Sequence, residues 1–383
     1  MNKVYIIGGT RTPIGKTGGV LKDFLPEQLA ALVLNETIRK FALSAGEIDH
    51  VILGNAWGPG GNLARVSILE ARWPHRIPGT TVDFQCGSGL SAISLAAAQI
   101  MSGQAELVIA GGLESTSMAP RKQFNSRDPR FQGTGFYERA PFSTPEAGDP
   151  EMGQAAENLA ELMNISREEM DRVALESHRR ACQAQSEGLL NDIILPINCQ
   201  GKIICNDECI RPGIKPELLA RMPSAFVKGG RITAGNACLK HDGAGVVLVA
   251  SEGAVRKYNL NPEAVILSCV SVGCNPNLFP LGPVPAIETM LQKSKLKIED
   301  IDAFEINEAF AVKVLACCRQ LGISHDKTNI LGGALAYGHP YGASGAVILL
   351  HLIKALRKVK GRMGIAAVGA TGGQGVSVLI KRC

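Results

Sequence analysis

The sequence predicts an α/β protein built from two similar halves, on the strength of three observations. Short apolar runs bounded by glycine or charged residues are typical of buried parallel strands. Segments with helical periodicity lie between these runs, and this alternation indicates a largely parallel sheet covered by helices. The chain also repeats itself weakly, since adding 253 to a position in the first half often reaches a similar residue in the second. The length of 383 residues suits two domains or one large layered domain.

The expected strands and helices follow each other along the chain. The strands are predicted at Val4–Ile7, His50–Leu53, Thr81–Phe84, Leu107–Ala110, Val246–Ala250, Val265–Cys269, Ala303–Ile306, Gly364–Val368 and Val376–Ile380. The helices are predicted at Glu27–Lys40, Leu90–Met101, Ala155–Leu162, Arg167–Ser186, Val284–Lys295 and Ala309–Leu321. A long excursion between the halves, about 118–235, begins with a Pro-, Gly- and Arg-rich stretch that predicts a functional or interfacial loop.

The internal repeat pairs two turns that carry chemically active residues. Under the offset of 253, Cys86 falls on His339 and Gly89 falls on Gly342. Each turn follows a predicted strand and opens a helix rich in small residues. A pseudo-twofold axis between the halves would bring the two turns together.

Composition excludes several classes of function. A net charge of +5 favours an anionic ligand but is too small to indicate nucleic-acid binding. Because no run approaches the roughly 18 apolar residues of a membrane span and no signal-peptide core is present, we expect a soluble, cytoplasmic protein. The 11 cysteines include no CxxC pair, so we expect reduced thiols and no metal site.

Cys86 is the candidate nucleophile. Gly87-Ser88-Gly89 follows it and allows a tight turn, and a helix begins at once. Backbone amides at a helix N-terminus stabilise a thiolate, and they can also hold an oxyanion. The alternative is a buried structural cysteine beside a packing turn.

His339 and Asn307 are the candidate partners of Cys86. His339 lies in a second Gly-rich turn, where it can deprotonate a thiol, although it could equally be a structural histidine bonded to a carbonyl. Asn307 follows a strand and can orient water or stabilise an oxyanion. The alternative for Asn307, which the residue alone favours, is an N-cap for the helix at Ala309–Leu321.

Two further Gly-rich turns follow strands, at 111–117 and 369–375. Neither has the spacing of a P-loop or of a dinucleotide-binding turn, so both sites are disfavoured. We expect these turns to let the two halves converge on one pocket.

Six ordered sequence blocks across the chain resemble the thiolases (acetyl-CoA acetyltransferases). Together they are far more specific than any one alone. The blocks are Cys86-Gly-Ser-Gly-Leu, Gly111-Gly-Leu-Glu-Ser-Thr-Ser, Met152-Gly-Gln-Ala-Ala-Glu-Asn, Thr233-Ala-Gly-Asn, Asn307-Glu-Ala-Phe and Gly338-His-Pro-Tyr-Gly-Ala-Ser-Gly.

The resemblance implies a duplicated αβαβα layered fold with mixed, mostly parallel sheets. It implies an N-terminal half at 1–117 and 236–260, a C-terminal half at 261–383, and a loop domain inserted at 118–235. It further implies a homodimer or homotetramer, a role in fatty acid metabolism, no permanently bound cofactor, and a coenzyme A thioester as the substrate.

The resemblance also assigns roles to residues. Cys86 would carry the acyl group, His339 would activate it, and Asn307 would share with His339 an oxyanion hole through a water molecule. The remaining residues would contact coenzyme A, and Arg211 suits its anionic nucleotide end. These residues are Met152, Arg211, Phe226, Ala234, Cys238, Ala309 and Phe310.

The chain departs from the family at Gly369, where thiolases carry a second catalytic cysteine that removes the α-proton of acetyl-CoA. A glycine has no side chain to act as this base. A second departure is Asn236-Ala-Cys-Leu-Lys-His-Asp-Gly243, where Cys238 replaces a serine and where Leu239, Lys240 and His241 introduce bulk and charge. Glu151 also stands where a histidine often precedes Met152. We therefore consider Cys238 or His241 as a replacement base.

Three interpretations follow. The first is a thiolase-type acyltransferase that works through an acyl-Cys86 thioester and condenses or cleaves short 3-oxoacyl-CoA. The second is an acyl transferase or thioesterase without carbon–carbon bond chemistry, because Gly369 replaces the base. The third is a non-catalytic acyl-CoA-binding subunit, against which the retention of Cys86, His339 and Asn307 argues.

Overall fold

The computed structural model describes residues 2–131, 133 and 135–383. The strands of its main sheet follow one another in the order β10-β11-β12-β9-β1-β8-β5-β3-β4, with β2 beside β8. Their bounds are β1 Val4–Arg11, β2 Gly15–Lys16, β3 His50–Gly54, β4 Gly79–Val82, β5 Leu107–Glu114, β8 His241–Ser251, β9 Ala264–Gly273, β10 Ala303–Ile306, β11 Met363–Ala370 and β12 Gln374–Arg382. A separate hairpin comprises β6 Ile197–Cys199 and β7 Lys202–Ile204.

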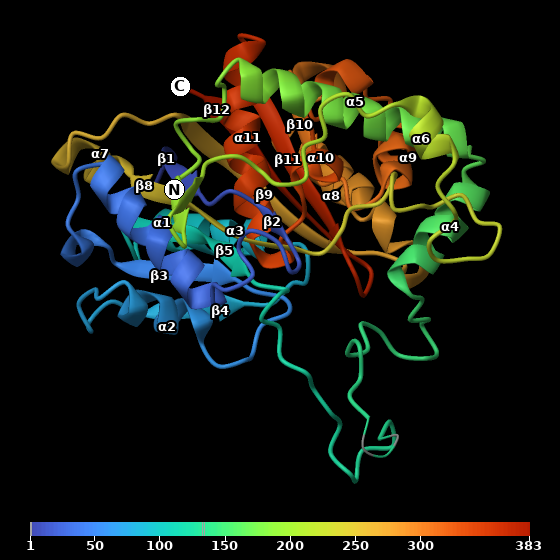
Figure 1. The fold of residues 1–383 in the computed structure, drawn as a ribbon. Coiled ribbons are helices and arrows are strands. Elements are labelled where there is room, and N and C mark those ends of the chain that lie inside the picture. Colours follow the sequence, from blue (N-terminus) through green and yellow to red (C-terminus); the bar gives the residue numbers. More distant parts are fainter. Residues whose placement is uncertain (1, 132, 134) are drawn as a thin grey trace.

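The helices cover both faces of this sheet and fill the space between its halves (Figure 1). Their bounds are α1 Pro26–Lys40, α2 Leu63–Glu70, α3 Ser88–Met101, α4 Met152–Leu162, α5 Arg167–Ser186, α6 Pro216–Ala220, α7 Glu252–Lys257, α8 Pro283–Ser294, α9 Ala311–Leu321, α10 Ala334–Tyr337 and α11 Ser344–Lys358. None of these helices is long and apolar enough to cross a membrane.

The core confirms the duplicated, five-layered arrangement. One apolar cluster surrounds α3 and α11 and joins them to inward-facing residues of both halves of the sheet. A second cluster packs α1 and α2 on the outer face of the N-terminal half, and a third packs α8 and α9 on the outer face of the C-terminal half. The two central helices are therefore shared between the halves, as the repeat predicts.

The prediction of mostly parallel sheets is wrong in its detail. Parallel pairs join β3 to β4, β3 to β5 and β10 to β11. Antiparallel pairs are more numerous: β1 with β8 and β9, β5 with β8, and β12 with β9 and β11. Strands covered on both faces are apolar whether their neighbours run with or against them, so the apolar runs could not reveal direction. The turn between β11 and β12 is tight because Gly372 and Gly373 adopt φ of +80° and +78°.

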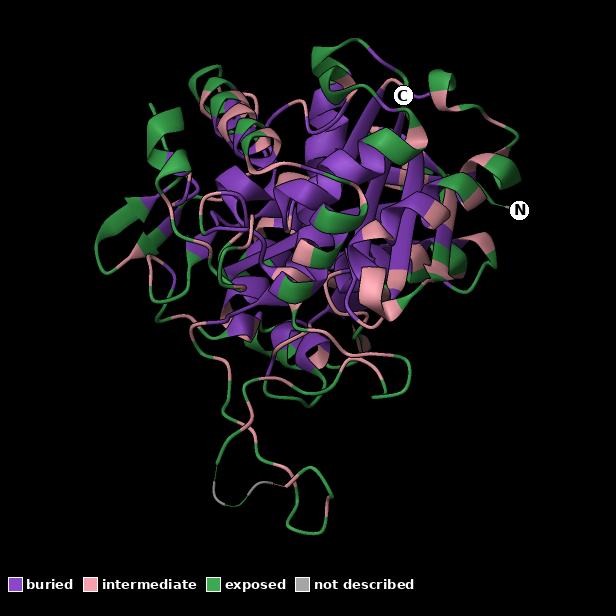
Figure 2. Cartoon of the chain, turned by 90° about the vertical axis from the view of Figure 1, so that its right-hand side faces the viewer, coloured by how far each residue is buried: buried purple, intermediate pink, exposed green. Residues whose placement is uncertain are grey.

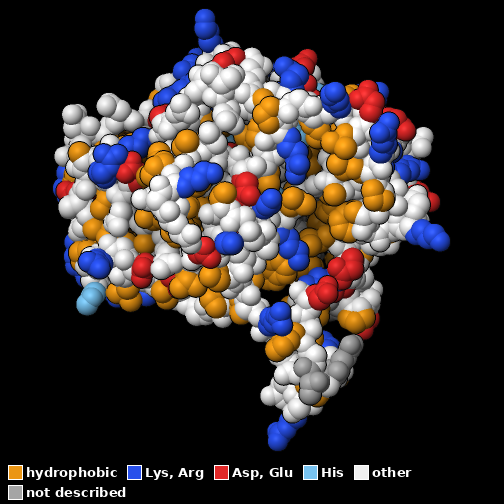
Figure 3. Space-filling view, in the orientation of Figure 1, with side chains coloured by type: hydrophobic (Ala, Val, Ile, Leu, Met, Phe, Trp, Pro, Cys, Tyr) orange, Lys and Arg blue, Asp and Glu red, His pale blue; other side chains and the backbone are white. Residues whose placement is uncertain are grey.

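The first part of the excursion, the segment between β5 and α4, projects from the layered body (Figures 1 and 3). Its described residues include few buried positions, in contrast to the central layers (Figure 2). The part of the segment nearest α4 is nonetheless attached to the body. Arg139 forms ion pairs with Asp149 and Glu151, and Asn277 Nδ2 donates to Ala147 O at 2.9 Å. The segment therefore reaches back over the turns that carry the candidate residues.

Candidate active site

Cys86 lies in a tight turn between β4 and α3. The preceding residue, Gln85, adopts a left-handed φ of +51°, which is unusual for a residue with a side chain. Its amide donates to Asp83 Oδ1 at 2.8 Å. Ser88 holds the turn from the other side, since its Oγ accepts from Phe84 N at 2.8 Å and donates to Gln85 O at 2.6 Å. Strand β4 ends at Val82, two residues earlier than predicted, which leaves room for this turn.

His339 lies in the corresponding turn of the C-terminal half. Gly338 adopts a φ of +113°, and His339 N donates to His241 Nδ1 at 3.0 Å. The His339 ring places Nδ1 at 3.1 Å from Asn307 Nδ2 and at 2.6 Å from Ser344 Oγ. Among the described residues, His339 Nε2 has no hydrogen-bond partner although it is buried. A buried polar atom without a partner indicates a place for a ligand or water.

The neighbours of His339 permit two states of its ring. The amide nitrogen of Asn307 only donates, so in this arrangement His339 Nδ1 accepts and the ring carries its proton on Nε2. An Nε2–H can donate to an oxyanion. If the Asn307 amide turns, its Oδ1, which has no partner among the described residues, accepts from a protonated Nδ1 and frees Nε2 to act as a base. Ser344 Oγ suits both states because a hydroxyl donates and accepts.

Asn307 does not cap the following helix. Helix α9 begins at Ala311, and its N-cap residue is Phe310, whose backbone is extended. Asn307 is buried and bonded to His339 instead. The cap interpretation is therefore excluded.

The two turns converge because glycines allow close contact. A Cβ added at Gly89 would lie 2.7 Å from Gly342 O, and one added at Gly345 would lie 2.1 Å from Leu90 N. The repeat therefore predicted both the equivalence of the turns and their contact.

A cavity of about 170 Å³ opens beside Cys86. It lies under the projecting segment, and the hydroxyl of Thr371 in its wall has no partner among the described residues. The residues around it are Ala56, Trp57, Asp83, Gln85, Cys86, Lys122, Tyr137, Arg139, Ala140, Phe142, Met152, Tyr341 and Thr371. The cavity is smaller than the roughly 300–1,000 Å³ of sites for drug-sized ligands, so it suits a small reacting group.

Burial keeps both reactive side chains neutral at rest. Desolvation raises the pKa of the Cys86 thiol to about 11, and a charge on Lys313, when that amine is protonated, only partly opposes this. Desolvation also holds the pKa of His339 well below its usual value, with Lys313 and His241 acting in the same direction. The expectation that the helix N-terminus stabilises a resting thiolate is therefore not met.

Several of the residues expected to contact coenzyme A lie together. Met152 lines the cavity at the start of α4. The rings of Phe226 and Phe310 meet edge to face at 6.0 Å, and Cys238 N donates to Ala309 O at 3.0 Å. Most of the residues expected to contact coenzyme A therefore lie near the N-termini of α4 and α9.

Two of the expected residues lie outside this group. Ala234 is exposed in the turn before β8. Arg211 is exposed, and its backbone amide donates to His178 Nδ1 on α5 at 3.2 Å. No contact of the described residues joins Arg211 to the cavity beside Cys86.

Several cavity residues were not predicted from the sequence. The projecting segment supplies Lys122, Tyr137, Arg139 and Phe142, in a stretch without periodicity. The ammonium of Lys240 lies over the ring of Trp57, 4.3 Å from the ring centre. Tyr341 and Thr371 had a local signal, since each lies in a Gly-rich turn that the sequence singles out.

Gly369 leaves no room for a side chain. A Cβ added there would lie 2.8 Å from Phe279 O and 2.8 Å from Pro283 Cδ. The Gly369 carbonyl accepts a hydrogen bond at 3.2 Å from Nζ of Lys313, a residue that the sequence analysis did not select.

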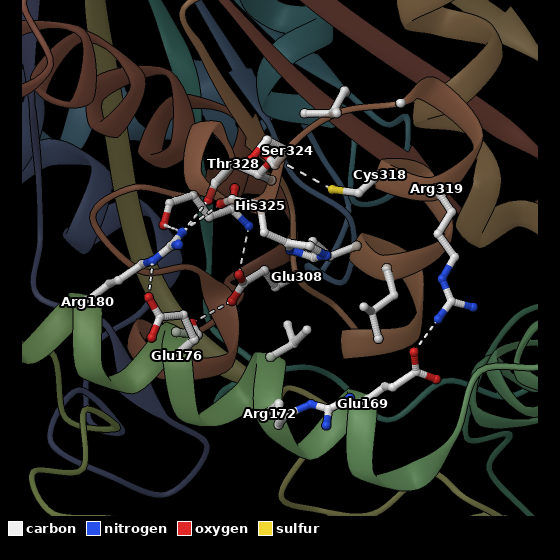
Figure 4. Close-up of a pocket in the computed structure, with 17 residues that line it drawn as sticks. Glu169, Arg172, Glu176, Arg180, Glu308, Cys318, Arg319, Ser324, His325 and Thr328 are labelled. Carbon is white, nitrogen blue, oxygen red and sulfur yellow. Dashed lines mark hydrogen bonds and ion pairs between the residues drawn. The ribbon is translucent and has the colours of Figure 1, made fainter.

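A larger cavity of about 700 Å³ lies elsewhere, between α5 and α9 (Figure 4). Several of its charged groups are already bonded: Arg180 forms an ion pair with Glu176, Arg319 forms one with Glu169, and Glu308 accepts from Ser177 Oγ at 2.6 Å. None of its lining residues lines the cavity beside Cys86. Within the described residues, no cluster of His, Cys, Asp and Glu is arranged to hold a metal.

Comparison with known proteins decides the family. Residues 4–253 match the family model of the thiolase N-terminal domain, and residues 260–382 match that of the thiolase C-terminal domain. The chain belongs to the thiolase family. The chain is therefore an acyltransferase of this family.

Relatives of this thiolase are similar over their whole length. VraB of Staphylococcus aureus (strain MRSA252), named as an acetyl-CoA C-acetyltransferase, is 41% identical over 385 residues that cover 100% of both chains. The structure of the Bacillus anthracis acetyl-CoA acetyltransferase matches with a TM-score of 0.94 and 38% identity, over 100% of this chain and 99% of that one. Human mitochondrial 3-ketoacyl-CoA thiolase in complex with CoA matches with a TM-score of 0.93 and 38% identity, over 100% and 98%.

Proposed function

We propose that this thiolase transfers acyl groups between coenzyme A thioesters through a thioester on Cys86, and that it condenses or cleaves short 3-oxoacyl-CoA. The observation that carries the proposal is the close contact of the two turns that hold Cys86 and His339, together with the buried atoms His339 Nε2 and Asn307 Oδ1, which have no partner among the described residues. Nucleophilic catalysis at a cysteine needs a base for the thiol and donors for the developing oxyanion. The relatives named for acetyl-CoA transfer support the choice of substrate.

The acylation half-reaction follows from the two states of the His339 ring. His339 Nε2 takes the Cys86 proton as sulfur attacks the thioester carbonyl. The oxyanion forms beside Asn307, and coenzyme A leaves with the proton from His339. We assign the short acyl group to the cavity of about 170 Å³. We assign the pantetheine arm to the neighbouring residues near the starts of α4 and α9, which are Met152, Phe226, Phe310, Ala309 and Cys238. We further propose the cytoplasmic location and a homo-oligomer.

Thiolysis of acetoacetyl-CoA by free coenzyme A tests this function. We expect the wild type to form acetyl-CoA, and Cys86→Ser and His339→Ala to lose at least 10²-fold in kcat. Arg256→Ala, at an exposed position of α7, serves as a surface control and should retain kcat. If the wild type releases coenzyme A from acetyl-CoA but leaves acetoacetyl-CoA intact, the alternative of an acyl transferase or thioesterase replaces the proposal.

A further inference from the structure

Lys313 lies at the start of α9, in the interior of the C-terminal half. Only 1% of its surface is exposed, which is rare for a lysine. Its Nζ donates to Gly369 O at 3.2 Å. Among the described residues no carboxylate forms an ion pair with it. Lys313 therefore contacts the backbone at the position where the family's second catalytic cysteine would stand.

The surroundings of Lys313 favour an uncharged amine. Burial lowers the pKa of Lys313, opposed by the charges of Cys86, Cys317, Cys238 and Cys274 when these are ionised. The positive end of the α9 dipole also disfavours an ammonium in the first turn of the helix. A neutral amine carries a lone pair, which is the requirement for a general base.

Cys86 and Lys313 belong to one electrostatic site. The charge of Lys313 acts on the pKa of Cys86, of Cys238 and of His339. At both thiols this charge partly offsets the rise in pKa that desolvation causes, and at the His339 imidazole it adds to the fall in pKa that desolvation causes. A proton transferred to Lys313 therefore stabilises the Cys86 thiolate that forms when the acyl group leaves.

The two other candidate bases are less suited. Burial raises the pKa of Cys238 to about 12, and a charged Cys86 raises it further, so its thiolate is scarce. His241 accepts from His339 N through Nδ1, which places its remaining proton on Nε2 and leaves no free lone pair. His241 thus positions the backbone of His339 and does not remove a proton.

We propose that the amine of Lys313 is the general base of the condensation step and replaces the cysteine absent at position 369. This inference rests on the proposed function, because it concerns the second half of the same reaction. The second substrate must then be an acyl-CoA that has a proton on the carbon beside its thioester carbonyl, because Lys313 removes this proton.

The proposed step conserves atoms and charge. Lys313 Nζ takes the α-proton of the second acyl-CoA and becomes an ammonium, while the substrate becomes an enolate. The enolate carbon attacks the carbonyl of acyl-Cys86, the carbon–carbon bond forms, and the carbon–sulfur bond to Cys86 breaks. The Cys86 thiolate then takes the proton from the Lys313 ammonium. In the cleavage direction the same proton travels the opposite way.

The test separates proton removal from acylation. Acetyl-CoA is incubated with enzyme in D₂O, and mass spectrometry follows both deuterium entering the acetyl group and acetylation of Cys86. We expect Lys313→Gln to acetylate Cys86 at a rate within about threefold of the wild type, while deuterium entry falls about 10²–10⁴-fold. Lys313→Arg, which keeps a donor and a positive charge but has no available lone pair, should lose exchange equally.

Lys327→Gln is the matched control and should retain deuterium entry, since Lys327 Nζ also donates to a backbone carbonyl, Ile301 O at 2.8 Å, but lies outside the site. Exchange that persists in Lys313→Gln or Lys313→Arg overturns the proposal, as does an equal loss of acetylation and exchange. A wild type that does not acetylate Cys86 at all contradicts the proposed function instead.

Should both lysine variants fail to fold, the wild-type pH profile of deuterium exchange decides. Exchange that levels off below about pH 10 supports an amine, and exchange that still rises toward pH 11 contradicts it.

Discussion

Cys86 and His339 illustrate how burial sets chemical state at the scale of a residue. The helix N-terminus favours a thiolate at Cys86, but the loss of water costs the thiolate more, and the pKa rises to about 11. The same loss of water keeps His339 neutral. A neutral thiol beside a neutral imidazole is stable until a substrate arrives.

The raised pKa of Cys86 predicts slow alkylation that accelerates with pH. Because only the thiolate is nucleophilic, modification of the Cys86 peptide by iodoacetamide should increase about tenfold per pH unit between pH 7 and 10. Mass spectrometry of the digested protein measures this rate. The exposed Cys205, read from the same digest, is the internal control. A Cys86 rate that levels off near pH 7 would mean that His339 already holds it as an ion pair.

The contact between His339 N and His241 predicts a positioning role for His241. His241→Ala removes the acceptor and leaves a buried N–H without a partner, which should cost about 1–3 kcal/mol of unfolding free energy. It should also slow acetylation of Cys86 by displacing His339.

Asparagine is the rescue variant, because its side-chain oxygen can accept where Nδ1 does. His241→Asn should restore the acetylation rate of Cys86 with KM unchanged. Equal losses in both variants would instead indicate that the imidazole itself takes part in the reaction.

At the scale of elements, the site depends on the close approach of α3 and α11. Both helices begin directly after a reactive turn, so their contact at Gly89, Gly342 and Gly345 sets the separation of Cys86 from His339. The sequence predicted this because the repeat aligned the two motifs. The antiparallel pairing of β8 with β1 and β5, and of β12 with β9, escaped prediction, since it joins segments that are distant in the sequence.

The helix contact predicts that Gly345 tolerates no side chain. Gly345→Ala would place Cβ 2.1 Å from Leu90 N and should lower the unfolding free energy by about 1–3 kcal/mol or more, because backbone must move. Denaturant unfolding measures the change. Gly253→Ala in α7 is the control, since its Cβ would meet only side-chain atoms, Glu106 Oε1 at 3.1 Å and Ser251 Oγ at 3.5 Å. An unchanged midpoint for Gly345→Ala would contradict the close contact.

At the scale of the whole molecule, the N-terminal and C-terminal halves meet at Glu114. This buried carboxylate at the end of β5 accepts from Asn55 Nδ2, Ala56 N and Trp57 N in the first half and from Gly342 N in the second. Desolvation nevertheless raises its pKa to about 7. One titratable group thus connects both halves of the site.

Glu114 predicts a pH-dependent contribution to stability. Because its pKa is higher in the folded than in the unfolded chain, this contribution is complete below about pH 4.5 and is lost as pH rises to about 7. The loss amounts to about 3 kcal/mol. Unfolding free energies of wild type and Glu114→Gln between pH 4.5 and 8 measure it. A difference between the two proteins that is independent of pH would contradict the raised pKa.

The sequence predicted the site where its signals were local. Cys86 and Asn307 each lie in a short motif after a strand, whereas His339 lies in a Gly-rich motif that follows the short helix α10 instead of the expected strand. The order of the three residues matches the thiolases. Lys313 gave no such signal, because its position depends on how α9 packs against β11. Lys122, Tyr137 and Phe142 lie in a segment without periodicity, so only the folded chain brings them to the cavity.

The central claim is that Cys86 carries the acyl group, and one measurement tests it most directly. Wild type and Cys86→Ser are incubated with acetyl-CoA, quenched in acid, and analysed by intact mass and by peptide mapping. The account predicts that the wild type gains the mass of one acetyl group on the peptide containing Cys86, with one equivalent of coenzyme A released, and that Cys86→Ser gains none. An acetyl group on another residue, or no adduct on the wild type, would contradict it.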